Sequence, residues 1–309
     1  KEEESNQIIE FTKEHQIEAI AVSLLFSFLN DVHEQQIGQR WRQALPGVPI
    51  FLSSEVLPEI REFERASTTA VCAYVGPILE SYLCRLEEAT GEMGLPDLHV
   101  MGSSGGVFGV AEGLKMPAMA IESGPAAGVI ATAMIGKHLD KPNLLSFDMG
   151  GTTAKLCLID GEEPEIVYRF EAAREKRFAE GSGLPIRISA VELIEIGAGG
   201  GSIAHVDAGG GFKVGPHSAG ARPGPACYGF GGEAPTVTDA NLALGRLDPD
   251  NFLGGSMALD ASAAEKVIDT LAEHLGIDRL EAAEGVLTIM NSNMANAIRA
   301  KTVQKGRAK

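Results

Sequence analysis

The sequence has few cysteines, no excess of basic residues and no long apolar run. Its four cysteines lie far apart without a C-x-x-C pair, which disfavours a zinc site or a disulfide framework and favours reduced thiols. The net charge of −16 disfavours a nucleic-acid partner, since such proteins usually carry a basic face. No apolar run reaches the roughly 18 residues that span a bilayer. These absences predict a cytoplasmic protein that binds neither nucleic acid nor membrane.

The composition that is present predicts a globular chain of one large domain or two ordinary ones. Hydrophobic residues make up 44% of the 309 positions and charged residues 22%. Apolar patterning predicts helices at 4–15 and 31–45 and strands at 17–28 and 48–53, an order typical of α/β proteins. The chain starts without a methionine and enters a helical pattern at once, so we expect it to be part of a longer polypeptide. No signal-peptide pattern is present at its start.

Two segments of the first half could contact a ligand or could be ordinary surface. Residues 55–65 are dense in charge, and we expect a solvated, self-paired surface segment rather than a ligand-facing one. A long helix is predicted at 66–89. A predicted strand at 98–101 then runs into Gly102–Gly106, a turn that could meet an anion or only reverse the chain.

A strand–turn–strand pattern over residues 144–160 carries the strongest chemical signal. The turn combines two glycines with two hydroxyls: Gly150, Gly151, Thr152 and Thr153. Glycine lets backbone N–H groups approach a phosphate, and the hydroxyls add donors. Asp148, at the end of the first strand, could hold Mg²⁺ through water or orient an attacking water. An ordinary hairpin whose glycines only permit positive φ is the alternative.

Thirteen glycines lie between residues 197 and 232, interleaved with prolines. We interpret this stretch as ordered functional loops, because prolines stiffen it and helix or regular sheet is disfavoured. Arg222 is a candidate for a bidentate contact with a carboxylate or carbonyl, with a structural salt bridge equally open. Cys227 could line the substrate region, and Asn241 could contact substrate or start a helix at Asp239.

Two other sites in this region are possible but disfavoured. A metal set is conceivable from His205, Asp207, His217 and Asp239, although hydrogen bonds to the glycine-rich backbone are favoured. A thiol nucleophile at Cys227 has no local support. The last part is helical: Ser262 with Glu265 and Asp278 with Glu281 are capping pairs that predict two helices.

Several motifs occur together in one order along the chain. They are residues 62–69 (EFERASTT), 123–128 (SGPAAG), 147–153 (FDMGGTT), 197–203 (GAGGGSI), 223–229 (PGPACYG) and 235–242 (PTVTDANL). Together they resemble the hydantoinase A / 5-oxoprolinase family, which includes the ATP-binding subunits of acetone carboxylases. The resemblance covers essentially the whole chain.

The resemblance implies an actin-like ATPase fold, a partial α/β structure with two ribonuclease-H-like lobes. Residues 1–145 would be the remainder of the first lobe with a connecting helix, and residues 146–309 the second lobe. It implies ATP and Mg²⁺ as cofactors, with nucleotide contacts from Gly150, Gly151, Thr152, Thr153, Gly199, Gly200 and Gly201, and a catalytic Asp148. The candidates for substrate contacts, chosen from the residues themselves, are Arg222, Cys227, Asp239 and Asn241.

The activity implied is ATP-dependent ring opening of a hydantoin or 5-oxoproline, by phosphorylation of the amide oxygen. A B-type partner subunit and a homo-oligomer are also implied. An ATP-dependent ketone carboxylase and a non-catalytic scaffold domain are the alternatives. The chain departs from the family pattern at Lys155, where many members have an acid. Lys155 could contact a phosphate instead or point away, which leaves the metal arrangement open. We also expect a first phosphate loop and an adenosine-binding string to lie outside this chain, so that the fragment alone is inactive.

Overall fold

The computed structural model describes residues 2–172, 181 and 183–306 and divides the chain into two compact units. Unit 1 comprises residues 1–142 and 160–192, and unit 2 comprises residues 143–159 and 193–309. Each unit therefore takes two separate stretches of sequence. No described helix combines the length and the apolar composition that a bilayer span requires.

Unit 1 begins with a helix–strand–helix–strand order, as the apolar pattern predicts. The elements are α1 (Glu2–Glu14), β1 (Ile20–Val22), α2 (Val32–Ala44) and β2 (Ile50–Leu52), with β1 and β2 parallel. The apolar faces of the helices close on the two strands, and the core there contains Ile9, Val22, Trp41, Leu45 and Leu52. Burial of these side chains stabilises the layer, because each contributes about 1.5–3 kcal/mol when removed from water.

The predicted strand at 17–28 is wrong beyond Val22. The chain turns after β1, and Phe26 adopts a positive φ of 58° that a strand cannot contain. Leu25 and Leu29 are exposed on this loop. The apolar run that suggested a longer buried strand therefore forms a surface loop.

The expectation of a solvated segment at 55–65 is wrong for Arg65, which is fully buried. Its guanidinium donates to Ser53 Oγ at 3.1 Å and to the carbonyl oxygen of Leu24 at 2.7 Å. The buried carboxylate of Glu34 accepts from the N–H of Leu24 and from Ser53 at 2.7 Å each. Burial alone would raise the pKa of Glu34, but these hydrogen bonds lower it below its ordinary value.

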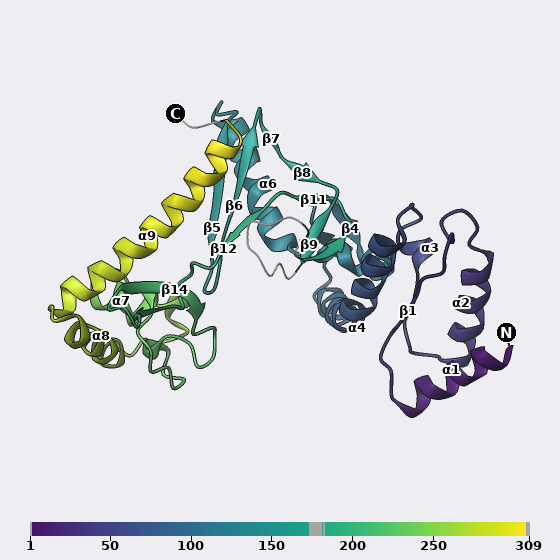
Figure 1. Ribbon diagram of the computed structural model, residues 1–309, viewed down its shortest axis with the longest axis horizontal. Helices are drawn as coiled ribbons and strands as arrows, with labels where there is room; N and C mark the ends of the chain where they lie inside the picture. Colours follow the sequence, from purple (N-terminus) through teal and green to yellow (C-terminus); the bar gives the residue numbers. More distant parts are fainter. Residues whose placement is uncertain (1, 173–180, 182, 307–309) are drawn as a thin grey trace. The chain divides into compact units, whose positions relative to one another are not determined.

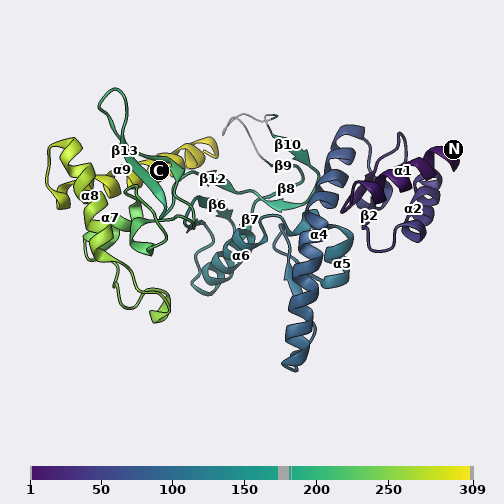
Figure 2. The same cartoon turned by 90° about the horizontal axis from the view of Figure 1, so that it is seen from below.

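The rest of unit 1 is arranged around a long helix, α4 (Glu62–Glu92), which continues through Pro77. Figure 2 shows α5 (Val110–Lys115) beside it. The other elements are α3 (Ser53–Val56), β3 (His99–Met101), β4 (Val107–Gly109), a 3-10 helix at Pro117–Ala120, α6 (Ser123–His138), β7 (Glu163–Pro164), β8 (Ile166–Val167), β9 (Phe170–Ala172), β10 (Leu184–Ile186) and β11 (Ala190–Val191). β3 and β4 are antiparallel and enclose the Gly102–Gly106 turn.

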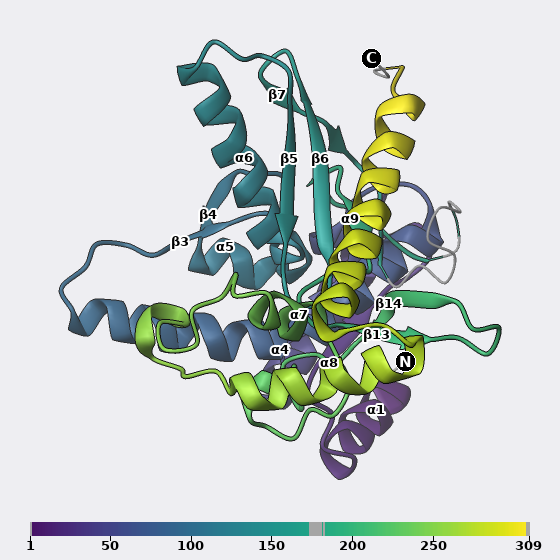
Figure 3. The same ribbon diagram turned by 90° about the vertical axis from the view of Figure 1, so that its left-hand side faces the viewer.

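Unit 2 contains the strands β5 (Leu144–Met149), β6 (Ala154–Asp160) and β12 (Ile194–Ile196), which pair antiparallel in the order β12–β6–β5. Figure 3 shows β5 and β6 as a long hairpin. A second hairpin, β13 (Ser202–Val206) and β14 (Phe212–Ser218), forms within the glycine-rich region. Part of that region is therefore regular sheet, contrary to the expectation of loops alone.

Three helices complete unit 2: α7 (Val237–Ala243), α8 (Ala261–Leu275) and α9 (Arg279–Gln304). Figure 1 shows α7 and α8 gathered at the beginning of α9. The core joins them to the sheet through Leu156, Ile196, Val237, Ile268 and Val286. Asp278 caps α9 as predicted, but α8 is capped by Asp260 through the N–H of Ala263, so the predicted capping residue Ser262 is wrong.

Candidate functional site

The connection between β5 and β6 is the predicted phosphate-binding turn, Gly150 to Thr153. The two strands pair in antiparallel register along the whole of β5, which confirms the strand–turn–strand prediction. The N–H of Gly150 donates to the carbonyl oxygen of Thr153 at 2.9 Å and closes the turn. Both glycines and Thr152 are exposed, so solvent reaches the turn.

Three hydrogen-bond donors of this turn are available to a ligand. They are the N–H of Gly151 and the hydroxyls of Thr152 and Thr153, none of which donates to another residue in the described part of the chain. Clustered N–H and O–H donors in a tight turn are suited to an anion such as phosphate. The geometry is therefore compatible with the predicted role.

A glycine-rich loop supports the turn from its carbonyl side. The N–H of Gly200 donates to the carbonyl oxygen of Gly150 at 3.0 Å, and the N–H of Gly201 donates to that of Gly151 at 2.6 Å. These two loop glycines thus act on the turn through their N–H groups. Their direct contact with nucleotide stays a prediction.

Gly199 explains why this loop contains glycine. A Cβ at this position would lie 2.6 Å from backbone atoms of Gly151 and Thr152, far inside van der Waals contact. Its own N–H donates to Ser202 Oγ at 3.0 Å. Any other residue would push the loop away from the turn that it supports.

Two residues that the sequence reasoning missed extend this support. The N–H and the hydroxyl of Thr238 both donate to the carbonyl oxygen of Gly200, at 2.8 and 2.9 Å. Ser218 Oγ lies 3.5 Å from the carbonyl oxygen of Gly151. Thr238 lies in the first turn of α7, so the capping pattern at residues 236–239 was the available signal.

Asp148 is exposed near the end of β5, and its cross-strand neighbour is Lys155. The described residues contain no group of three or more His, Cys, Asp or Glu side chains that could hold a metal ion by themselves. A single carboxylate fits Mg²⁺, which is usually held by one or two carboxylates together with waters and substrate phosphates. The residues present therefore fit an ion that arrives with a nucleotide.

Arg222 is an exposed cation on a loop that is tied to the same support. Its guanidinium lies 4.9 Å from the ring centroid of Phe230, within cation–π range. Ala219 N–H donates to the carbonyl oxygen of Gly201 at 2.8 Å, and Gly224 N–H donates to that of Ala219 at 3.1 Å. No ion pair joins Arg222 to an acid in the described ranges, so its charge is available to an anionic or carbonyl group.

Asp239 is fully buried and serves the loops rather than an open site. Its carboxylate accepts from the N–H groups of Ala226, Cys227 and Thr236 at 3.3, 2.9 and 3.0 Å, and from the Thr236 hydroxyl at 2.7 Å. Thr236 and Asp239 also form a capping box at the start of α7. Asp239 thereby fixes the 225–227 segment to the helix.

Cys227 belongs to this segment, and Asn241 lies on α7. Burial first, and then the charge of Asp239, raises the pKa of the Cys227 thiol well above its ordinary value, so the thiol stays neutral and is a poor nucleophile. The side-chain amide of Asn241 donates to the carbonyl oxygen of Val237 at 3.0 Å, within α7. Of the four predicted substrate residues, the structure leaves Arg222 exposed and buries Asp239 and Cys227.

The alternative metal set from His205, Asp207 and His217 gains no support. The Asp207 carboxylate accepts from the N–H groups of Gly209 and Gly211 at 3.0 and 2.8 Å. The Gly211 bond is the main cause that lowers the pKa of Asp207. This carboxylate closes the β13–β14 turn, which agrees with the favoured interpretation of hydrogen bonds to glycine backbone.

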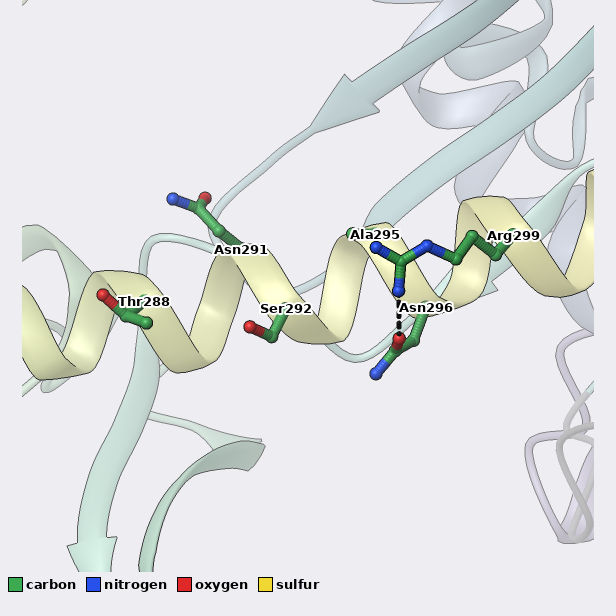
Figure 4. A pocket seen from close by; sticks show the side chains of 6 residues that line it. All are labelled: Thr288, Asn291, Ser292, Ala295, Asn296 and Arg299. Carbon is green, nitrogen blue, oxygen red and sulfur yellow. Dashed lines mark hydrogen bonds between the residues drawn. The ribbon is translucent and has the colours of Figure 1, made fainter. Parts of the chain in front are cut away.

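A separate pocket of about 540 Å³ lies on α9. All six side chains that line it come from this helix, as Figure 4 shows: Thr288, Asn291, Ser292, Ala295, Asn296 and Arg299. Arg299 donates to Asn296 Oδ1 at 3.1 Å. None of the residues of the β5–β6 turn lines this pocket.

Known proteins resemble the chain over most of its length. A family model described as Hydantoinase/oxoprolinase matches residues 65–309. The chain is 41% identical to the uncharacterized protein MJ0964 of Methanocaldococcus jannaschii, over 99% of this chain and 45% of that protein. It is 39% identical to caprolactamase subunit alpha of Pseudomonas jessenii, over 96% of this chain and 42% of that subunit.

The nucleotide-free structure of acetone carboxylase superposes with a TM-score of 0.82 at 29% identity, over 99% of this chain and 42% of that chain. The chain thus spans less than half the length of these relatives. The structural likeness confirms the predicted α/β fold of the actin-like ATPase type. With a matching family model and relatives of this identity, the chain belongs to the hydantoinase/oxoprolinase family.

Proposed function

We propose that the chain is part of an ATP-dependent enzyme that opens a cyclic amide by hydrolysis. The observation that carries the proposal is the β5–β6 turn, with its available donors at Gly151, Thr152 and Thr153 beside the carboxylate of Asp148. Membership of the hydantoinase/oxoprolinase family and 39% identity to a caprolactamase subunit support the reaction class. The substrate would be a hydantoin, 5-oxoproline or a similar lactam.

The chemistry explains why such a reaction would consume ATP. An unactivated amide is a poor electrophile, and phosphorylation of its oxygen makes that oxygen a leaving group. The amide oxygen attacks the terminal phosphorus and ADP leaves. Water adds to the activated carbon, the C–N bond breaks with a proton delivered to nitrogen, and a second water releases phosphate. The net reaction converts ATP, the lactam and two waters into ADP, phosphate and the open amino acid.

In this proposal, the turn donors bind and orient the phosphates. Asp148 holds the ion that accompanies them or positions water, and Mg²⁺, when bound, neutralises developing charge on the phosphoryl group. Gly199, Gly200 and Gly201 keep the turn in shape. Arg222 contacts the substrate carbonyl or a carboxylate on it. Cys227, Asp239 and Asn241 shape the loops that border the substrate.

The proposal includes partner subunits. Relatives are named as subunits, including caprolactamase subunit alpha and acetone carboxylase beta subunit. We therefore propose that a B-type subunit completes the enzyme and that the assembly contains more than one copy of this chain. Co-purification of the two tagged gene products, followed by light scattering, tests both points.

The deciding experiment measures ADP formation by the full-length gene product, with its partner subunit, in the presence of hydantoin, 5-oxoproline and caprolactam. We expect one of them to stimulate ADP formation at least tenfold, with one ring opened per ADP. Asp148→Asn should abolish the stimulation while thermal stability is kept. If no cyclic amide stimulates ATP hydrolysis, the proposal is wrong.

Carboxylation is the second candidate, favoured by the TM-score of 0.82 to acetone carboxylase. In that case ATP would activate a ketone and bicarbonate, and labelled bicarbonate would appear in an acid-stable product. A scaffold role without catalysis is the third candidate. In that case the full-length protein would bind no nucleotide, and Asp148→Ala would leave its behaviour unchanged.

A further inference from the structure

A row of three charged residues crosses the sheet beside the turn. Lys155 on the central strand β6 has Asp148 of β5 opposite it on one side and Glu195 of β12 opposite it on the other. Residues directly opposite in adjacent strands share one face of a sheet, so the three side chains form one row. The neighbouring positions Leu156 and Ile196 belong to the core on the other face.

The row is well suited to hold an ammonium in place. Directly opposite side chains on antiparallel strands have Cβ atoms about 4.5–5.5 Å apart, and opposite charges at such positions attract. Asp148 and Glu195 are exposed, whereas Lys155 is half-buried. One cation thus stands between two carboxylates.

The row lies at the base of the turn that carries the anion-binding donors. Asp148 precedes Gly150 by two residues, and Lys155 follows Thr153 by two. Strand register therefore places Lys155 opposite Asp148, at the base of the turn whose Gly151 N–H and threonine hydroxyls are the donors available to an anion. A compact ammonium on a flexible stem can turn from a carboxylate toward a phosphate oxygen.

We propose that Lys155 is the cation of this anion site and makes it selective for a nucleoside triphosphate over a diphosphate. The inference rests on the proposed function and identifies which ligand the turn prefers. The added terminal phosphate carries the extra negative charge, so loss of Lys155 weakens triphosphate binding most.

The test is calorimetric binding of ATP and ADP, each with and without Mg²⁺, to the full-length protein and its variants. Lys155→Gln should weaken ATP binding about tenfold and ADP binding less than threefold, so the ATP preference falls. Lys155→Arg keeps the charge and should retain the preference. Lys213→Gln removes the same charge from an exposed position on β14 and should change neither affinity more than twofold.

Unfolding temperatures are measured in parallel, and Lys155→Met, which keeps most of the apolar stem without the charge, replaces Lys155→Gln if the latter does not fold. Equal weakening of ATP and ADP by the Lys155 variants, or no weakening, overturns the inference while the proposed function stands. The same change of preference in Lys213→Gln overturns it too. If the unaltered protein binds neither nucleotide, the proposed function fails and this inference fails with it.

Discussion

The β3–β4 turn of unit 1 and the β5–β6 turn of unit 2 have similar compositions, but their hydroxyl groups differ in whether they bind to other parts of the chain. In the β3–β4 turn, Ser103 is buried and its Oγ lies 2.6 Å from the carbonyl oxygens of both Met119 and Ile121. In the β5–β6 turn, the threonine hydroxyls have no such partner among the described residues, while the carbonyl oxygens are held by a distant loop. Glycine and hydroxyl residues in a turn therefore do not indicate a ligand site by themselves. What distinguishes the second turn is that its support leaves the donor side open.

The largest expected effect comes from Asp239, which anchors the loops behind the second turn. Asp239→Ala leaves three buried N–H groups and one hydroxyl without their acceptor. We expect a loss of about 3–5 kcal/mol in the free energy of unfolding, because unpaired buried donors are costly. Denaturant unfolding of the full-length protein measures this loss. Asp207→Ala, which removes a less buried turn carboxylate, should have a much smaller effect, and equal effects would show that the buried network does not support unit 2.

Gly199→Ala should be next in size, because the added methyl would meet backbone that cannot rotate away. We expect a loss of about 1–3 kcal/mol of stability, together with a strong loss of ATP affinity since the turn itself is displaced. Gly105→Ala is the matched control in the β3–β4 turn, where a Cβ would lie 2.5 Å from the Ile130 side chain at a φ of +83°. It should lower the unfolding temperature and leave ATP binding intact. Intact ATP affinity in Gly199→Ala would refute the supporting role of the glycine loop.

The third comparison is between the hydroxyl groups of Thr152 and Thr153 in the β5–β6 turn and that of Ser103 in the β3–β4 turn. The double variant Thr152→Val, Thr153→Val should weaken ATP binding about tenfold, or ~1.4 kcal/mol, within the range expected for two hydrogen bonds, and change the unfolding temperature little. Ser103→Ala should do the reverse and destabilise by about 1–3 kcal/mol, because the carbonyl oxygen of Ile121 loses the buried Ser103 hydroxyl, while that of Met119 keeps the Ser103 N–H. Titration calorimetry and thermal unfolding of both variants separate the two roles. If both variants change the same quantity, the contrast between the turns is wrong.

Local sequence predicted the second turn well and its surroundings poorly. The β5–β6 hairpin and the Asp278 cap of α9 follow from residues within a few positions of one another. The burial of Arg65 does not, because its acidic neighbour Glu34 lies 31 positions earlier. The role of Asp239 as a buried acceptor likewise depends on distant residues, because the N–H groups of Cys227 and Ala226 lie 12 and 13 residues before it in the chain.

The candidate site shows the same division between local and distant information. The family resemblance implies nucleotide contacts for Gly199, Gly200 and Gly201, and in the structure these residues closely approach the backbone of the turn. The local sequence does not reveal this second partner, and the nucleotide contact stays a prediction. Likewise, the acidic neighbours of Lys155 become visible only with strand register, since Glu195 lies 40 residues further on.

The smallest expected effect concerns a buried thiol in each unit. Burial raises the pKa of Cys72 to about 11, and burial with the charge of Asp239 raises that of Cys227. In the unfolded chain a thiol ionises near ~8.5, so above that pH the unfolded state binds fewer protons and the free energy of unfolding falls. Below that pH the contribution of the buried thiols to the free energy of unfolding is fully present. Denaturant unfolding between pH 7 and 10 should show this decline, reduced in Cys72→Ala.

Alkylation of the native protein at pH 9 gives the matching chemical test, with exposed Cys84 as the internal reference. Iodoacetamide should modify Cys84 and leave Cys72 and Cys227 unmodified until denaturant is added, as read by mass spectrometry of the peptides. Modification of Cys227 at the rate of Cys84 would mean that the loops around Asp239 open in the native protein. The second turn would then lack the rigid support that distinguishes it from the first, because the same Asp239 network holds both the thiol and the α7 start that carries Thr238.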